Sequence, residues 1–217
     1  SAAVMVVLLG LIIFGGVKRI AKFTEIVVPF MALGYILVAC TIVGLNISKV
    51  PEVLRLIVSS ALGIDAGFGA MLGLAIQWGV KRGVFSNEAG QGSGPHPAAA
   101  AEVKHPAEQG IVQAFAVYVD TLLVCSATAF MILITGLYNV KGVNPGSTVN
   151  NLPGVGVGPG FTQAAVESAL PGFGSIFVAA ALFFFAFTTI VAYYYIADTN
   201  VAYMNRKMNR PWLSFLL

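Results

Sequence analysis

The chain has 217 residues, of which 58% are hydrophobic and only 10% are charged, and its formal net charge is +3. This balance excludes an ordinary soluble domain and provides no basic surface of the kind that binds nucleic acid. Cys40 and Cys125 each lie in the middle of an apolar run, which excludes a disulfide framework and predicts two buried thiols. The composition therefore predicts an all-α integral membrane protein.

Apolar runs long enough to cross a bilayer, which takes about 20 helical residues, recur along the chain. Residues 1–17 are predicted to be a span whose beginning is missing, followed by a basic turn at 17–23. Full spans are predicted at 25–46 and 109–138, and a last one begins near residue 173. Because the chain begins without Met and ends in a new apolar segment at 211–217, we expect a single transporter domain that is truncated at both ends.

Two stretches between these spans do not fit an unbroken crossing. Residues 51–62 place their apolar side chains on one helical face, which predicts a short helix at the membrane surface. Residues 66–80 are apolar, but the polar stretch GVFSNEAGQGS at 83–93 and the prolines Pro95 and Pro97 follow them. Glycine costs about 1 kcal/mol and proline about 3 kcal/mol inside a helix, so we expect a discontinuous segment here.

The rest of the topology follows from turn residues and basic residues. A loop rich in Gly and Asn is predicted at 141–160, with a short helix at 161–170 after it. Basic residues are enriched in cytoplasmic loops, and placing the turn at 17–23 inside also places Lys104 and the cluster at 206–210 inside. This arrangement predicts five crossings, provided that the broken segment counts as one of them.

The stretch GVFSNEAGQGS carries the polar groups that are hardest to place in a membrane. Polar side chains such as those of Asn87 and Glu88 cost several kcal/mol when they face lipid, so we expect them to face a partner, the bundle interior or a water-filled pathway. Broken helices of this kind hold substrates and coupling ions in many secondary transporters. The alternative is an ordinary loop at the membrane surface, where Ser, Asn and Gly are common.

Other polar residues lie within the predicted spans. Asp120 requires a partner, which Lys81 or Arg82 could supply. The hydroxyls of Thr188 and Thr189, like those of Ser126 and Thr128, either bind a hard cation such as sodium or bond back to their own helix. Both interpretations remain open from the residues alone.

Metal binding and catalysis receive little support from the sequence. His96 and His105 lack the partners of a transition-metal site, so none is expected. Ser93 and His96 are close in sequence, but the nucleophile elbow pattern G-x-S-x-G is absent and no third triad residue is evident. We therefore expect that the protein is not an enzyme.

Two strings of residues, RGVFSNEAGQGS and EQGIVQAFAVYVDTLLVCSATAFMILITGLY, closely resemble the alanine or glycine:cation symporter family, the sodium:alanine carriers of bacteria and archaea. KRIAKFTEIVVPFMALGYI and LFFFAFTTIVAYYYIADTN extend the resemblance over nearly the whole chain. The resemblance implies a leucine-transporter-like bundle of two inverted five-helix repeats, whose first and sixth helices are broken at the substrate. It implies that this chain holds roughly the fourth to eighth helices, with the break of the sixth at 83–94.

The resemblance also implies site residues. Those that match the substrate-lining stretch of the sixth helix are Phe85, Ser86, Asn87, Ala89 and Gly90. In the eighth helix, Thr189 matches the substrate and sodium region, and Thr188 is a candidate sodium ligand. Tyr193 replaces a tryptophan that typically limits side-chain volume, which leaves the substrate size open. Asp120 matches an acidic position of the seventh helix, and we group it with the ion-binding residues.

The hypothesis from the sequence is sodium-coupled symport of a small neutral amino acid, alanine or glycine, into the cell. The protein is expected to lie in the plasma membrane of a bacterium or archaeon, with sodium as its coupling ion, no cofactor and no nucleic-acid partner. One alternative is a proton-coupled carrier in which Glu88 or Asp120 relays the proton. The other is a membrane protein that does not transport, and the oligomeric state is left open.

Overall fold

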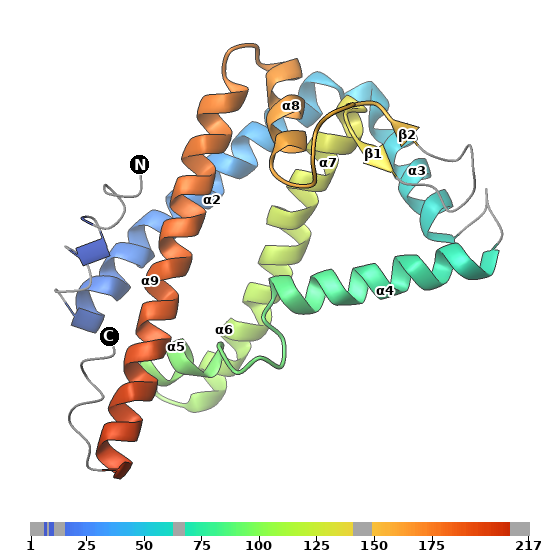
Figure 1. Ribbon diagram of the computed structural model, residues 1–217. Helices are drawn as coiled ribbons and strands as arrows, with labels where there is room; N and C mark the ends of the chain where they lie inside the picture. Colours follow the sequence, from blue (N-terminus) through green and yellow to red (C-terminus); the bar gives the residue numbers. More distant parts are fainter. Residues whose placement is uncertain (1–6, 8, 11–15, 63–67, 141–148, 209–217) are drawn as a thin grey trace. The chain divides into compact units, whose positions relative to one another are not determined.

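The computed structural model of the chain is helical almost throughout (Figure 1). It describes residues 7, 9–10, 16–62, 68–140 and 149–208. The elements are α2 (Gly16–Leu45), the 3₁₀ turn η1 (Ile47–Lys49), α3 (Val50–Leu62), α4 (Phe68–Ser86), α5 (Pro95–Ala100), α6 (Pro106–Tyr118), the π-helical segment η2 (Val119–Cys125), α7 (Ser126–Thr135), β1 (Asn139–Val140), β2 (Val149–Asn150), α8 (Gly160–Ala169) and α9 (Gly174–Met208).

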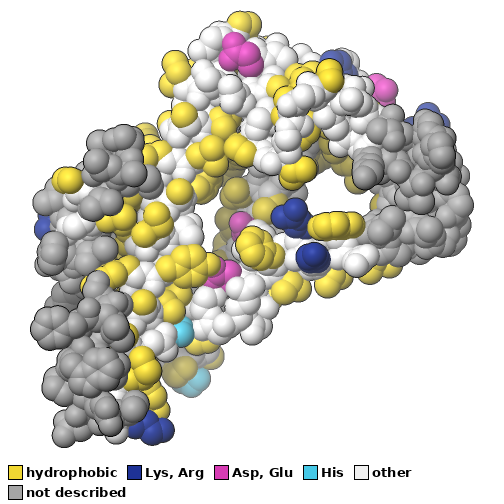
Figure 2. All heavy atoms as spheres, in the orientation of Figure 1, with side chains coloured by type: hydrophobic (Ala, Val, Ile, Leu, Met, Phe, Trp, Pro, Cys, Tyr) yellow, Lys and Arg dark blue, Asp and Glu magenta, His cyan; other side chains and the backbone are white. Residues whose placement is uncertain are grey.

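Three helical stretches are long and apolar enough to cross a membrane: Arg19–Leu45, Pro106–Thr135 and Gly174–Lys207. They confirm the three full spans that the sequence predicts. Their apolar side chains are largely exposed, as Phe30 and Ile111 illustrate, and hydrophobic side chains cover much of the described surface (Figure 2). Helices with this outward apolar surface are suited to contact with lipid.

Other predicted elements differ in outcome. The short helices expected at 51–62 and 161–170 are confirmed as α3 and α8. The basic turn expected at 17–23 is wrong, because these residues form the first turns of α2. Lys and Arg are good helix formers, so a cluster of them does not end a helix. Most of the first predicted span and the terminal apolar segment at 211–217 lie outside the described residues.

The helices divide into two compact units, each of which we describe by itself. The first unit comprises Ser1–Leu33, Gln91–Gln113 and Ala181–Leu217, and the second comprises Gly34–Gly90 and Ala114–Ala180. In the first unit, Phe187 and Val191 of α9 are buried against Ile20 of α2.

The second unit is built around α7. This helix packs against α8 and α3, and its Met131 and Ile134 are fully buried. Tyr35 of α2 stacks on Phe177 with ring centroids 5.6 Å apart, and its hydroxyl lies 2.8 Å from Thr128 Oγ1 of α7. These contacts hold α7, which continues directly from η2, the segment that carries Asp120.

The corner between α8 and α9 is closed by one side chain. The carboxylate of Glu167 accepts hydrogen bonds from the backbone N–H groups of Gly172 and Gly174, at 2.6 Å and 2.9 Å. A Cβ atom at Gly174 would lie 2.7 Å from the carbonyl oxygen of Gln163, so the close approach requires glycine. The short β1–β2 hairpin, which pairs Asn139 with Asn150, precedes this corner.

Candidate functional site

Helix α4 ends at Ser86 in a defined terminating turn. The backbone N–H of Ala89 donates to the Val84 carbonyl at 3.0 Å, and that of Glu88 donates to the Phe85 carbonyl at 3.2 Å. This pair of bonds is the Schellman motif, which needs one residue with a left-handed backbone. Glu88 takes that position with φ 49°, although a non-glycine residue costs about 1 kcal/mol there. The interruption predicted from the sequence is therefore present, but it begins after Ser86 rather than at residue 83.

The last residues of α4 bond directly to η2. Ser86 Oγ donates to Asp120 Oδ2 at 2.7 Å. Asn87 Nδ2 donates to Thr121 Oγ1 and to the carbonyl oxygen of Gly83, each at 3.1 Å. The bond to Asp120 is charge-assisted when the carboxylate is ionised, and bonds of that kind are about twice as strong as neutral ones. Two adjacent residues of one helix end are thus joined to two adjacent residues of another helix.

The prediction that Lys81 or Arg82 pairs with Asp120 is wrong. Among the residues that the structure describes, no Lys or Arg lies within ion-pair distance of Asp120. Lys81 and Arg82 instead lie over the ring of Trp78, with Nζ and Cζ at 4.9 Å and 5.8 Å from its centroid. The ring is three and four residues away on the same helix, close enough to attract both cations.

The thiol of Cys125 also belongs to this site. Its Sγ lies 3.6 Å from Ser86 Oγ and 3.7 Å from Asp120 Oδ2. Both Cys40 and Cys125 are exposed, so the expectation of two buried thiols is wrong. Asp120 and Cys125 are five residues apart, a spacing that places them on one face only because η2 is π-helical. Sequence periodicity for an α-helix contains no signal for this pairing.

We call these residues the α4–η2 polar group: Ser86, Asn87, Asp120, Thr121 and Cys125. Its carboxylate, hydroxyl and amide oxygens are the ligands that hard cations prefer. Its carboxylate is equally able to accept a proton. Thr121 was not among the predicted site residues. It directly follows Asp120 in the sequence, and this adjacency is the signal that could have identified it.

The hydroxyls predicted in α9 have local partners. Thr188 Oγ1 donates to the Phe184 and Phe185 carbonyls at 2.9 Å and 3.1 Å, and Thr189 Oγ1 donates to Phe185 at 2.7 Å. Thr188 is only 9% exposed, whereas Thr189 and Tyr193 are exposed. A hydroxyl that donates its hydrogen retains lone pairs that can still bind a cation.

The predicted site residues are divided between the two units. Ser86, Asn87 and Asp120 meet in the second unit, whereas Thr188, Thr189 and Tyr193 belong to the first. The other predicted substrate residues, Phe85, Ala89 and Gly90, are exposed at and after the end of α4.

Ser93 and His96 do not form a nucleophile and base pair. His96 Nδ1 lies 3.0 Å from the Gly92 carbonyl oxygen and its Nε2 lies 3.1 Å from Asn200 Nδ2. The hydroxyl of Tyr195 donates to the His96 carbonyl at 3.3 Å. Ser93 Oγ is buried without a hydrogen-bond partner, so its hydroxyl is not activated by the imidazole.

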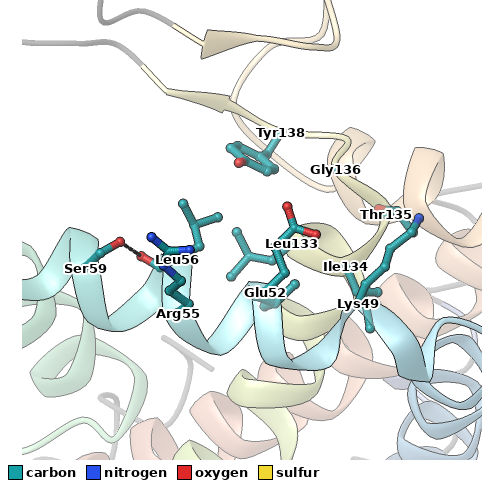
Figure 3. Close-up of a pocket in the computed structure, with 11 residues that line it drawn as sticks. Lys49, Glu52, Arg55, Leu56, Ser59, Leu133, Ile134, Thr135, Gly136 and Tyr138 are labelled. Carbon is teal, nitrogen blue, oxygen red and sulfur yellow. Dashed lines mark hydrogen bonds between the residues drawn. The ribbon is translucent and has the colours of Figure 1, made fainter. Parts of the chain in front are cut away.

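A separate pocket of about 440 Å³ lies between α3 and the C-terminal end of α7 (Figure 3). Lys49, Glu52 and Arg55 of the η1–α3 segment line one side, and Tyr138 lies opposite them. None of the predicted site residues lines this pocket.

A model of the sodium:alanine symporter family matches residues 1–216 of the chain. The matched range includes both the α4–η2 polar group and the hydroxyls of α9.

Individual relatives agree with the family match. A Bacillus subtilis protein named as a candidate sodium/proton-dependent alanine carrier is 63% identical over 208 residues, which are 96% of this chain and 43% of that protein. A sodium/proton-dependent alanine carrier of Bacillus sp. (strain PS3) is 61% identical over 98% of this chain and 48% of its own length. A sodium/alanine symporter of Methanococcus maripaludis is 39% identical over 93% of this chain and 42% of its own length. The chain thus spans less than half the length of these relatives.

Proposed function

The chain belongs to the sodium:alanine symporter family, and we propose that the full-length protein carries alanine or glycine into the cell together with sodium. The chain is part of a multi-pass membrane transporter and not of an enzyme. The observation that carries the proposal is the hydrogen-bonded contact of Ser86 and Asn87 with Asp120 and Thr121. Many secondary transporters bind substrate and coupling ion where an interrupted helix meets its neighbours inside the membrane.

The end of α4 is suited to the ammonium group of an amino acid. The C-terminal end of a helix carries partial negative charge, and the residues after Ser86 leave the helix. The small residues Ala89 and Gly90 leave the backbone there open to a ligand. The substrate carboxylate would be bound by residues upstream of this chain in the leucine-transporter-like bundle that we propose for the whole protein.

Each unit by itself supplies candidate oxygen ligands for a coupling ion. Asp120 supplies a carboxylate, and Thr188 and Thr189 supply hydroxyl lone pairs that their own hydrogen bonds leave free. Cation binding would favour the conformation that also binds the amino acid, which couples the two by their differential affinity for that conformation. Tyr193, which follows Thr189 by one turn, would limit the substrate side chain.

Proton coupling is the second candidate, and a specific observation favours it. Asp120 is bonded to a neutral hydroxyl and to no basic side chain in the described part of the chain, so it can accept a proton without breaking an ion pair. Two of the relatives are named as sodium/proton-dependent carriers. In this version Asp120 takes the proton and Ser86 remains its hydrogen-bond partner.

Uptake of labelled alanine by proteoliposomes containing the full-length protein tests the proposal. We expect an inward sodium gradient at constant pH to drive accumulation, and competition by glycine. A proton gradient at constant sodium would drive accumulation instead if the second candidate is correct. Uptake that responds to neither gradient would refute both forms of coupling.

Asn87→Ala tests the substrate site directly. The side-chain amide of Asn87 donates both to Gly83 of α4 and to Thr121, whereas that of Asn46 donates to Ile42 of α2, at 3.0 Å. We expect Asn87→Ala to weaken alanine binding about tenfold or more, which corresponds to about 1.4 kcal/mol, while the matched variant Asn46→Ala leaves it unchanged. Equal alanine affinity in both variants would remove Asn87 from the site.

A further inference from the structure

The short helix α5, which follows the interruption after α4, is attached to α9 through His96. Asn200 Nδ2 of α9 lies 3.1 Å from His96 Nε2, and the Tyr195 hydroxyl donates to the His96 carbonyl at 3.3 Å. α5 has no buried residue. A cavity of about 720 Å³, lined mainly by small and apolar residues such as Ala98 and Pro106, separates it from α6. Few apolar contacts hold α5, so these hydrogen bonds decide its position.

The geometry around the imidazole fixes its protonation. Nδ1 lies 3.0 Å from the carbonyl oxygen of Gly92, which can only accept, so Nδ1 must carry a hydrogen. Nε2 faces the amide nitrogen of Asn200, which can only donate, so Nε2 must present its lone pair. His96 is therefore neutral in this arrangement.

The amide of Asn200 cannot turn over to suit a protonated ring. Asn200 Nδ2 also donates to the carbonyl oxygen of Ile196 at 2.7 Å. Exchanging the amide nitrogen and oxygen would place two acceptors against each other at that distance. A proton on Nε2 of His96 would consequently face a donor, and Asn200 could turn this donor away only by giving up its bond to Ile196.

In the part of the chain that the structure describes, no carboxylate lies within ion-pair distance of the His96 ring. The titratable group of α9 that contacts His96 is the hydroxyl of Tyr195, which bonds to its backbone carbonyl. Asp198 in α9 and Glu102 and Lys104 after α5 are the nearby charged residues along the chain. Among the described residues, none of them lies within ion-pair distance of the imidazole.

We propose that His96 is a proton-binding site whose protonation releases α5 from α9, and that this site makes transport sensitive to pH independently of the coupling ion. The second part rests on the proposed transport function. Because the attachment requires an unprotonated Nε2, uptake of a proton by the imidazole at lower pH weakens it. Because α5 follows the interruption after α4, its release frees residues 91–100.

Hydrogen exchange of the full-length protein in lipid nanodiscs tests the release without requiring transport. After correction for intrinsic exchange rates, we expect amide protection in residues 91–101 to fall about tenfold or more between about pH 8 and about pH 5.5. His96→Gln, which cannot titrate, should abolish this pH dependence. The matched variant His105→Gln should retain it, because the imidazole of His105 accepts a local bond from the N–H of Ala107.

A second variant tests whether α5 is released because two hydrogen-bond donors, Asn200 Nδ2 and a protonated His96 Nε2, face each other. Asn200→Asp presents a carboxylate that accepts from a protonated imidazole, so we expect protection at about pH 5.5 to be retained or raised relative to about pH 8. Wild-type protection that does not change over this range, or that changes equally in His96→Gln, would overturn the proton site. These results would stand even if the protein failed to transport alanine.

Uptake measurements test the second part separately. The pH profile of alanine uptake at constant sodium should flatten in His96→Gln and remain as in wild type in His105→Gln. An unchanged profile in His96→Gln, with pH-dependent exchange confirmed in the wild type, would overturn the link to transport. Absence of any alanine uptake by the wild type would refute the proposed function and leave the exchange result intact.

Discussion

Two regions of this molecule place polar side chains inside apolar helices, and they satisfy them in different ways. In the α4–η2 polar group, Ser86 and Asn87 bond across to Asp120 and Thr121 of another helix. In α9, Thr188 and Thr189 bond to carbonyls of their own preceding turn. A back-bonded hydroxyl is satisfied wherever its helix lies, whereas a bond between helices requires both partners to be in place. The first region therefore depends on the fold, and the second needs only its own helix.

The largest effect should come from the first region. Asp120→Asn removes the charge while preserving the shape and an acceptor for Ser86. We expect sodium-driven alanine uptake by the full-length protein to fall about tenfold or more, because charge-assisted bonds contribute about 1.5–3 kcal/mol. The initial rate as a function of sodium concentration measures this, with Asp198→Asn in α9 as the control. Identical sodium dependence in both variants would show that the contact between the helices is structural only.

A moderate effect is expected from the second region, and α9 provides its own control. Thr189 and Thr199 both bond back to carbonyls one turn earlier, but only Thr189 lies in the proposed site. Thr189→Val should raise the sodium concentration for half-maximal uptake about fivefold, which is about 1 kcal/mol, while Thr199→Val leaves it within about twofold. If the two variants behave alike, the hydroxyls of α9 serve their helix and bind no ion.

The smallest effect concerns stability and uses one helix, α2. The Tyr35 hydroxyl bonds to Thr128 of α7, whereas Thr24 bonds back to Ile20 and Ala21. Tyr35→Phe should cost about 1 kcal/mol of unfolding free energy, and Thr24→Val only a few tenths. Thermal unfolding of the full-length protein in detergent measures both. A larger loss for Thr24→Val would contradict the distinction between bonds across helices and bonds within one.

The same distinction separates what the sequence could and could not predict about the fold. The spans at 25–46 and 109–138, and the surface helix at 51–62, were predicted because length and apolar content are local properties. The π-helical turn within the second span was missed, since nothing in the composition of Val119–Cys125 distinguishes it from an α-helix. The basic residues at 17–23 were assigned to a turn, although charge alone does not interrupt a helix.

The site shows a similar division. The interruption after Ser86 could be predicted from glycine and polar content. The partner of Asp120 could not, because the choice between Ser86 and the nearby cations Lys81 and Arg82 depends on how two helices meet. The roles of the individual site residues came from family resemblance and remain proposals to be tested by the variants above.

The π-helical segment places a constraint on chain length as well as on residue type. Each residue of an α-helix advances the chain by about 100° around the axis, so removing one residue from η2 would rotate everything on one side of it relative to the other. Substitutions along η2 change one side chain at a time. Removing a residue between Thr121 and Cys125 would instead rotate Asp120 and Thr121 relative to Cys125, so that the three could no longer all face α4.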